Sequence, residues 1–207
     1  MSIQLSFVET RVLGCLIEKD MATPEYYPLS IHALINACNQ KTNREPMTQL
    51  DEDTVHGTLD ALKERQLATV LTGGSNRVPK YGHRASETLD LNNREMAVVC
   101  VLLLRGPQTL NEIKTRTESL YRFDDHDAVE NTLHRLSERG MVLLLPKQAG
   151  MREPRWGHLL SGEIAIQAAE ETAPAPTREP LADRVSRLEA EMDSLKAQFA
   201  EFRRQFE

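Results

Sequence analysis

The chain has 207 residues, of which 40% are apolar and only 5% aromatic, enough for one large domain or two small ones. Its formal net charge of −6, with the excess of acids after residue 162, lacks the basic balance of most nucleic-acid binders but leaves room for local basic patches. No apolar run reaches the ~20 residues that span a bilayer, no secretory signal is visible and the three cysteines form no CxxC pair. We therefore expect a cytoplasmic protein with reduced thiols and no membrane contact.

The first helix is predicted to begin after Ser6, because Ser6 and Glu9 form a capping box and the apolar residues that follow recur at helical spacing. A proline-containing connection leads to a second helix over about 30–40. The polar stretch CNQKTNREP (38–46) follows, and Pro46 prevents the helix from continuing. This stretch is either a turn that its own side chains stabilise or a binding loop. The second alternative arises because a turn does not require the two cations, Lys41 and Arg44.

A third helix is predicted over 51–65, with apolar residues at i, i+4 and i+7 on one face. LATVL (67–71) is a predicted strand, and the glycines of TGGSNRV (72–78) suit a hairpin turn. A returning strand ends at Tyr81. The order helix, helix, helix, strand, turn, strand is typical of a winged helix-turn-helix domain.

The chain then repeats this unit. DTVHGTLDALKERQLATVL (53–71) aligns with DAVENTLHRLSERGMVLLL (127–145) at a constant offset. One inserted residue later, PKYGH (79–83) aligns with PRWGH (154–158). Such a match over two segments indicates a duplicated structural unit.

The second copy predicts the same elements: a helix capped by Asn92 and Glu95, helices over about 109–119 and over 124–139, and a hairpin that returns to Trp156. We therefore expect an α+β, mainly α, fold of tandem winged helix-turn-helix domains followed by a C-terminal coiled-coil helix. The predicted boundaries are domain 1 over 1–86, domain 2 over 87–163, an Ala/Pro/Glu-rich linker over 164–180 and the coiled-coil helix over 181–207.

The coiled-coil prediction depends on apolar residues that alternate steps of four and three along the tail. Opposite charges at neighbouring g and e positions favour a parallel homodimer, although the oligomer number stays open. The alternative is a single amphipathic helix that packs on the domains. The predicted oligomerisation residues are Leu181, Val185, Leu188, Met192, Leu195, Phe199, Phe202 and Phe206.

Catalytic motifs are not apparent in the sequence. The glycines at 72–76 lack phosphate-loop spacing, and no histidine or cysteine pair has metal-ligand spacing. His83 and His158 occupy equivalent repeat positions, for which we expect a structural role at a strand end. We expect neither an enzyme nor a bound cofactor or metal.

A nucleic-acid interface would have to avoid the third helix of each copy. Acids predominate in the helices over 51–65 and 124–139, and carboxylates there would face the phosphates of DNA. The hairpins and the loop at 38–46 are basic instead, although their cations could simply pair with those acids. The candidate contacts to nucleic acid or a partner are Lys41, Asn43, Arg44, Arg77, Lys80, Arg84, Lys147, Arg152 and Arg155, with Arg44 favoured first.

Several stretches resemble one bacterial family. They are TRVLGCLIEKDMATPEYYPLSIHALINACNQKTNREP (10–46), GSNRVPKYGHR (74–84), VVCVLLLRGPQTLNEIKTR (98–116) and REPRWGHLLSGE (152–163). Together they make the chain similar to YceH-like proteins over about residues 5–163. The resemblance implies a tandem winged-helix fold and a cytoplasmic bacterial setting, and implies no activity.

Two functional hypotheses follow from these features. The first is a DNA-associated regulator that contacts phosphates through the basic hairpins and the loop. The alternative is a dimeric adaptor whose winged helices bind an unidentified partner protein. An enzyme is the least favoured class.

Overall fold

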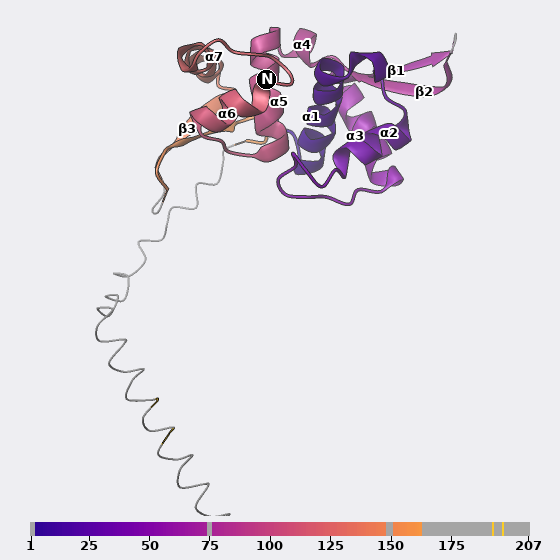
Figure 1. Ribbon diagram of the computed structural model, residues 1–207. Helices are drawn as coiled ribbons and strands as arrows, with labels where there is room; N and C mark the ends of the chain where they lie inside the picture. Colours follow the sequence, from indigo (N-terminus) through magenta and orange to yellow (C-terminus); the bar gives the residue numbers. More distant parts are fainter. Residues whose placement is uncertain (1–2, 74–75, 148–150, 163–191, 193–195, 197–207) are drawn as a thin grey trace, which may run out of the picture. The chain divides into compact units, whose positions relative to one another are not determined.

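The computed structural model describes residues 3–73, 76–147, 151–162, 192 and 196, with only the backbone given for Asn76 and Arg77. The chain divides into two units, Met1–Ile166 and Gln167–Glu207. In the second unit the two described residues, Met192 and Lys196, are helical and exposed. The other predicted oligomerisation residues lie outside the described part of the chain. The first unit is α+β, about half helical with two small antiparallel sheets (Figure 1).

Both copies of the repeat have the same order of elements. The first contains α1 (Phe7–Ala22), α2 (Ile31–Cys38), α3 (Glu52–Glu64), β1 (Ala68–Gly73) and β2 (Asn76–His83). The second contains α5 (Asn93–Arg105), α6 (Leu110–Thr117), α7 (His126–Glu138), β3 (Val142–Leu145) and β4 (Arg155–His158). Two short elements that the sequence did not predict are a 3-10 turn, η1 (Pro24–Tyr26), and α4 (Ala85–Thr88), which joins the copies.

The predicted helix starts are confirmed. The Ser6 hydroxyl accepts from the Glu9 backbone N–H, while the Glu9 carboxylate accepts from the Ser6 N–H at 2.7 Å. Asn92 and Glu95 form the same capping box at the start of α5. The first residue of each box satisfies N–H groups that have no partner inside the helix, so these starts are set by local sequence.

The sheets are antiparallel and equivalent. Ala68 pairs with His83 in the first hairpin, and Val142 pairs with His158 in the second. In each copy one further residue from the connection before the second helix bridges to the returning strand: Leu29 to Tyr81 and Gln108 to Trp156. The hairpin strand nearer the third helix, β1 or β3, therefore forms an edge of its sheet in the described part.

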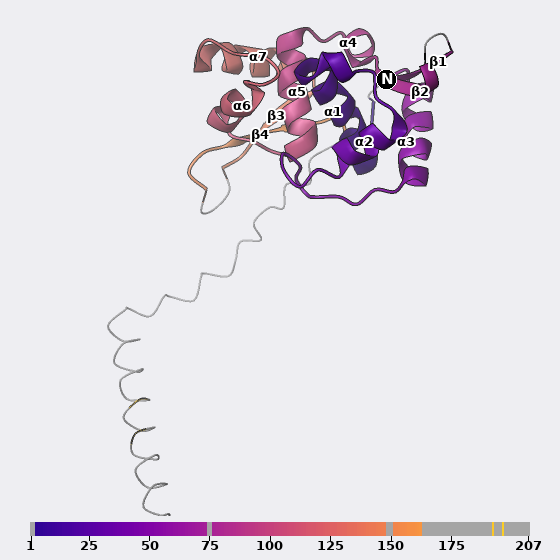
Figure 2. The same ribbon diagram turned by 45° about the vertical axis from the view of Figure 1, so that its right-hand side comes forward.

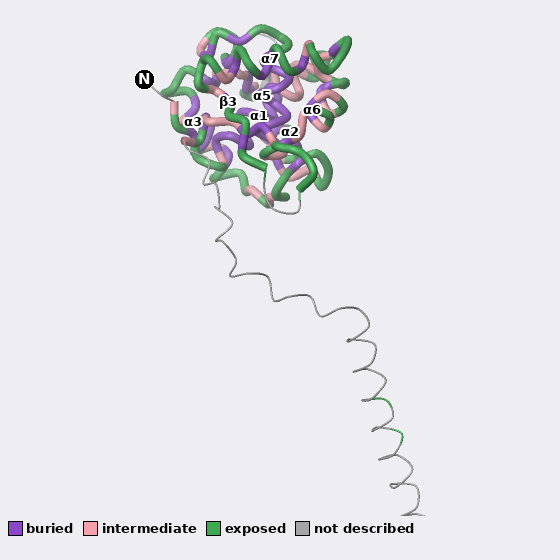
Figure 3. The backbone as a smooth tube through the Cα atoms, turned by 90° about the vertical axis from the view of Figure 1, so that its left-hand side faces the viewer, coloured by how far each residue is buried: buried purple, intermediate pink, exposed green. Residues whose placement is uncertain are grey.

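The two copies pack through their corresponding first helices. Helices α1 and α5 lie side by side at the centre of the unit (Figures 1 and 2), and both are mostly buried (Figure 3). Gly14 makes the close approach possible, because a Cβ there would lie 2.9 Å from Cδ2 of Leu104 and 3.2 Å from Cβ of Leu103. The Cys100 thiol donates to the Gly14 carbonyl oxygen at 3.4 Å at the same crossing. The described cysteines are all reduced and buried.

A second feature recurs in both copies. The arginine that ends the third helix reaches the capping-box glutamate of the first helix: Arg65 Nε lies 3.3 Å from Glu9, and Arg139 Nη1 lies 3.5 Å from Glu95. Both glutamates are buried. The duplication therefore preserves a non-local contact that fixes the third helix against the first.

Candidate protein and nucleic-acid interfaces

Arg44, the first candidate for binding, is fully used inside the chain. Its Nη1 and Nη2 donate to the two carboxylate oxygens of Glu18 at 3.0 and 2.6 Å. The remaining donors reach the carbonyl oxygens of Ala37 and Asn43, both at 2.9 Å, and the Gln40 side-chain oxygen at 3.0 Å. A guanidinium has five N–H donors, and here all five are bonded.

Arg44 and Glu18 stay charged although they are buried, because each stabilises the charge of the other. The Arg44 side chain is 0% exposed, and burial alone would lower its pKa, but the bonds to Glu18 hold the pKa above its ordinary value. Burial alone would likewise raise the pKa of Glu18, and Arg44 holds it below its ordinary value. The pair is therefore ionised. Because all five donors of Arg44 are bonded within the chain, none is left for the phosphate contact that the sequence predicts for it.

The loop around Arg44 joins the two copies. Asn43, in the left-handed region at φ 63°, accepts through its side-chain oxygen from Arg105 of α5. The backbone N–H of Glu45 donates to the Leu104 carbonyl oxygen at 2.8 Å. We call residues 39–46 the strap, because they follow α2 of the first copy and are hydrogen-bonded to α5 of the second. The described part of the second copy has no counterpart of the strap.

The other candidate cations divide into two groups. Arg84 pairs with Glu87 of α4 at 2.7 Å, and Arg155 pairs with Glu112 of α6 at 2.8 Å. Their partners therefore lie on α4 and α6, and not on the acidic third helices. Four cations make no ion pair within the described residues: Lys41, Lys147 and Arg152, which are exposed, and Lys80, which is half-buried. The side chain of Arg77 lies outside the description.

The structure does not bring these cations together. In Figure 1 β3 lies on the left-hand side of the first unit and the β1–β2 hairpin at its right-hand end, with α1 and α5 between them. The N-terminal ends of α3 and α7 remain acidic, and the caps Asp51 and Asp125 accept from Thr54 and Ala128 N–H groups at 2.8 Å. These carboxylates therefore have a structural role at the helix starts.

The second hairpin carries a surface that the sequence interpretation missed. Leu143 and Leu144 on β3 are 39% and 44% exposed, although Val142 and Leu145 on the same strand are buried. In the described part β3 pairs with β4 on one side only. The unbroken run VLLL was the available signal, because a half-buried strand would alternate apolar and polar residues.

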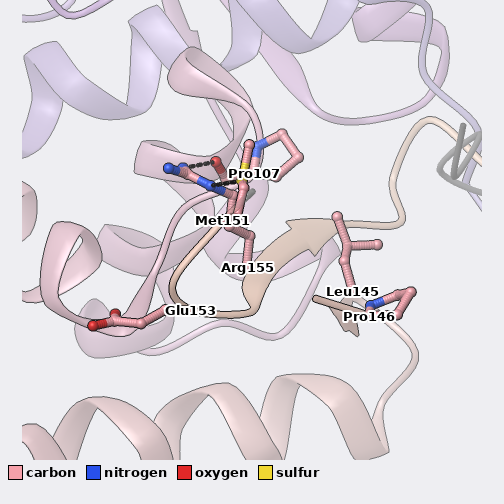
Figure 4. Close-up of a pocket in the computed structure, with 6 residues that line it drawn as sticks. All are labelled: Pro107, Leu145, Pro146, Met151, Glu153 and Arg155. Carbon is pink, nitrogen blue, oxygen red and sulfur yellow. Dashed lines mark hydrogen bonds between the residues drawn. The ribbon is translucent and has the colours of Figure 1, made fainter. Parts of the chain in front are cut away.

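A cavity of about 260 Å³ adjoins this edge strand (Figure 4). Apolar side chains of Leu145, Pro146 and Met151 contribute to its lining, together with the oppositely charged Glu153 and Arg155. Arg155 is held in place, since it donates to the Pro107 carbonyl oxygen at 3.0 Å and to the Met151 sulfur at 3.4 Å. The edge, the leucines and this cavity form what we call the β3 surface.

The two equivalent histidines differ. His83 has both ring nitrogens bonded: Nε2 lies 3.1 Å from an Asp20 oxygen, and Nδ1 accepts from the Ala85 N–H at 3.2 Å. The structural role expected for His83 is confirmed. His158 Nδ1 is buried without a partner among the described residues.

In the described part of the chain, none of the helices combines the length and the apolar character that a membrane span requires. No group of three or more His, Cys, Asp or Glu side chains there is placed to hold a metal ion.

Comparison with known proteins gives a family and no activity. The family model described as "Protein of unknown function, DUF480" matches residues 5–151. A "UPF0502 protein" of Solibacter usitatus is 50% identical over 209 residues, which cover 100% of both chains. Proteins of the same name from Aeromonas hydrophila and Pelobacter propionicus are 47% and 50% identical, covering 96% and 99% of this chain and 94% and 95% of theirs. The family-level resemblance found from the motifs is confirmed.

Proposed function

Since the chain belongs to the DUF480 family, whose description names no reaction, we propose from geometry that it is a non-enzymatic tandem winged-helix adaptor. Its partner is an extended segment of another protein, which adds a strand to β3. The observation that supports this proposal most directly is that β3 is an edge strand with two exposed leucines and lies beside a preformed cavity. The cytoplasmic setting stays a prediction.

The winged-helix assignment is supported by the order of elements in each copy. Three helices precede a hairpin, and one residue before the second helix bridges to the returning strand in both copies. This order of elements is typical of a winged helix and supports the proposal. We propose the predicted domain limits, 1–86 and 87–163, as the two winged helices.

The β3 surface indicates the chemistry of the partner. An added strand would bond to the open main-chain edge of β3, and its apolar side chains would cover Leu143 on one face of the sheet and Leu144 on the other, beside the cavity. Lys147 and Arg152 are exposed at the tip side of the hairpin and favour acids that flank the apolar residues. The expected ligand is therefore an apolar, extended peptide with flanking Asp or Glu.

The predicted coiled coil at 181–207 would present two such surfaces to a partner. Linking two sites raises apparent affinity through effective concentration, without any new contact. Light scattering of the full chain and of a chain that ends before residue 178 tests this step. We expect a dimer and a monomer, and two monomers would contradict the coiled-coil prediction.

A matched pair of leucines tests the β3 surface. Leu71 on β1 is 44% exposed, as Leu144 is, but lies on the other hairpin. Random peptides of about a dozen residues are selected against the full-length protein, and the enriched ones are measured by fluorescence anisotropy. We expect Leu144→Lys to weaken binding about tenfold or more and Leu71→Lys to leave it nearly unchanged. Equal loss in both variants, or no enriched peptide, would overturn the proposal.

DNA contact is the second candidate, favoured by the four cations that lack an acid partner in the described part: Lys41, Lys80, Lys147 and Arg152. Their contacts would be to phosphates and independent of sequence. Anisotropy with random-sequence duplex DNA at two salt concentrations measures this directly, since log affinity falls with log salt by about 0.9 per phosphate contact. An absence of binding by the full-length protein at low salt removes this candidate.

A further inference from the structure

A small cavity of about 30 Å³ lies where the strap meets α5 and α6. The first copy contributes Glu18 of α1 and Asn43 of the strap to its lining. The second copy contributes three further polar residues: Arg105 of α5, Arg116 of α6 and Ser119 just after α6. A polar cavity of this volume holds one ligand about as large as a water molecule.

Arg105 is a cation without an acid partner. It is half-buried and makes no ion pair with any residue in the described ranges. Its guanidinium donates to the side-chain oxygen of Asn43, and most of its five N–H donors have no partner among those residues. Burial, and next the charge of Arg116, lowers the pKa of Arg105. Two guanidinium groups that approach one small cavity repel each other, and an anion between them would remove that repulsion.

The charge of Arg116 is only partly offset. Its guanidinium lies 3.6 Å from one carboxylate oxygen of Glu112. The other oxygen of Glu112 accepts from Arg155 at 2.8 Å and from the Thr109 N–H at 2.9 Å. One carboxylate therefore serves two arginines, and Arg116 keeps donors for a further acceptor.

The ends of α5 and α6 do not occupy these arginines as helix caps. The Leu104 carbonyl oxygen accepts from the Glu45 N–H, and the Thr117 carbonyl oxygen accepts from the Leu120 N–H, both at 2.8 Å. Carbonyl oxygens at a helix end attract cations, but here the backbone already supplies donors to them.

Glu18 is the acid in the cavity wall, and its charge opposes an anion. Both of its carboxylate oxygens accept from Arg44, and Lys19 Nζ lies 3.1 Å from one of them. Two cations therefore offset this one carboxylate. The neighbouring acids of the strap and of the segment after α6, Glu45 and Glu118, are exposed and do not line the cavity. The balance of charge around the cavity is positive, which favours an anion over a neutral water molecule.

We infer that this cavity binds one small monovalent anion of the size of chloride. Four groups in its lining can donate hydrogen bonds to the anion: the guanidinium groups of Arg105 and Arg116, the amide nitrogen of Asn43 and the hydroxyl of Ser119. Because these groups belong to the strap, α5 and α6, the anion would hold the strap to the second copy and would stabilise the folded chain through its binding energy. The inference does not rest on the adaptor function.

Three sodium salts at equal ionic strength test the inference in the full-length protein. Chloride and bromide fit a cavity of this volume, whereas gluconate is too large for it. We expect the melting temperature to rise with the concentration of chloride or bromide and not with gluconate. In crystals soaked in bromide, we expect an anomalous scattering peak between Arg105 and Arg116. The absence of that peak would mean that the cavity holds only water, and the inference would be wrong.

Variants tie the anion to the two arginines. The quantity compared is the difference in melting temperature between chloride and gluconate within each protein, so a general loss of stability does not affect it. Arg105→Gln and Arg116→Gln should each weaken chloride binding about tenfold or more and thereby remove most of this difference. The matched control is Arg135→Gln, which changes an exposed arginine of α7 outside the cavity and should keep the difference.

An undiminished difference in both Arg105→Gln and Arg116→Gln would refute the assigned site. If either variant does not fold, the bromide peak still decides, because it is measured on the unchanged protein.

Discussion

Gln66 and Gly140 have the same left-handed backbone, with φ 59° and 68°, two residues beyond the ends of α3 and α7. Their N–H groups donate to Lys63 and Ser137 carbonyl oxygens, both at 2.9 Å. The next residues, Leu67 and Met141, donate five residues back at 2.8 and 2.9 Å. Both helices therefore end in a Schellman motif, but only one copy has the glycine that this backbone favours.

Because Gln66 and Gly140 share this backbone but not the residue type, substitutions at the two positions should change stability in opposite directions. Gln66→Gly should raise the free energy of unfolding by about 0.5–1 kcal/mol, because glycine adopts a positive φ without steric cost. Gly140→Gln should lower it by about 1 kcal/mol. Urea unfolding measures both. A decrease for Gln66→Gly would show that the Gln66 side chain contributes more than its backbone strain removes.

The buried ion pair of the strap predicts a large loss. Arg44→Ala leaves Glu18 without its partner and should lower the free energy of unfolding by about 3–5 kcal/mol. Arg84→Ala is the control, because its pair with Glu87 is exposed, and it should change stability by at most about 1 kcal/mol. Similar losses of unfolding free energy in both variants would mean that Arg44, with its five hydrogen bonds, stabilises the protein no more than an ordinary surface ion pair.

Glu18 predicts an acid-sensitive contribution to stability. Its pKa in the folded protein is lowered by Arg44, against the opposing effect of burial, so the unfolded chain takes up the proton first as the pH falls. The contribution is complete above the unfolded pKa of about 4.3 and is lost as the pH falls through the folded pKa. Glu18→Gln should flatten the stability curve in this window. A parallel curve, displaced to lower stability, would contradict the assignment.

His158 also makes stability depend on pH, but in a higher pH range than Glu18 and through burial instead of an ion pair. Burial lowers its folded pKa to about 4, so between an unfolded value of about 6.5 and pH 4 the unfolded chain binds the extra proton. Stability should therefore fall by about 2–3 kcal/mol as the pH falls across this window. His83, whose pKa burial also lowers, adds to the slope. His158→Gln should reduce the slope of stability against pH in this window.

The helix crossing at Gly14 predicts a packing defect on substitution. A methyl group there would overlap Leu104 and Leu103, so Gly14→Ala should lower the free energy of unfolding by about 1–3 kcal/mol. Gly57 on α3 is the control, because no atom lies within 4 Å of a Cβ built there. Gly57→Ala should raise stability by up to about 1 kcal/mol through helix propensity. Thermal unfolding compares the two, and a gain at both positions would exclude a tight crossing.

Features set by neighbouring residues could be predicted from the sequence. The capping boxes of Ser6 and Asn92 join residues three apart, and the structure confirms both. Helix α2 ends at Cys38, slightly before the predicted limit of about 40, because the backbone there turns into the strap. The repeat also predicted equivalent hairpins, since its two copies share Pro, Gly and His at the returning strand.

Features set by distant residues could not be predicted. Arg44 is 26 positions from Glu18, and nothing in a polar loop shows that its cation is buried against another helix. The polar character of the stretch instead favoured a solvent-exposed contact. The difference between His83 and His158 is also tertiary, because Asp20, which contacts His83, belongs to α1. Equivalent residues in a duplicated sequence therefore need not keep equivalent partners.

The α1–α5 crossing joins corresponding helices of a duplicated unit, as a two-fold interface between identical subunits would. In a true dimer that contact would form or dissociate with protein concentration. Here one chain carries both halves, so the pairing is permanent at any dilution. The strap on one side then removes the equivalence of the halves. One half thus carries the strap and the other half carries the cavity beside β3, a difference that two identical subunits would not have.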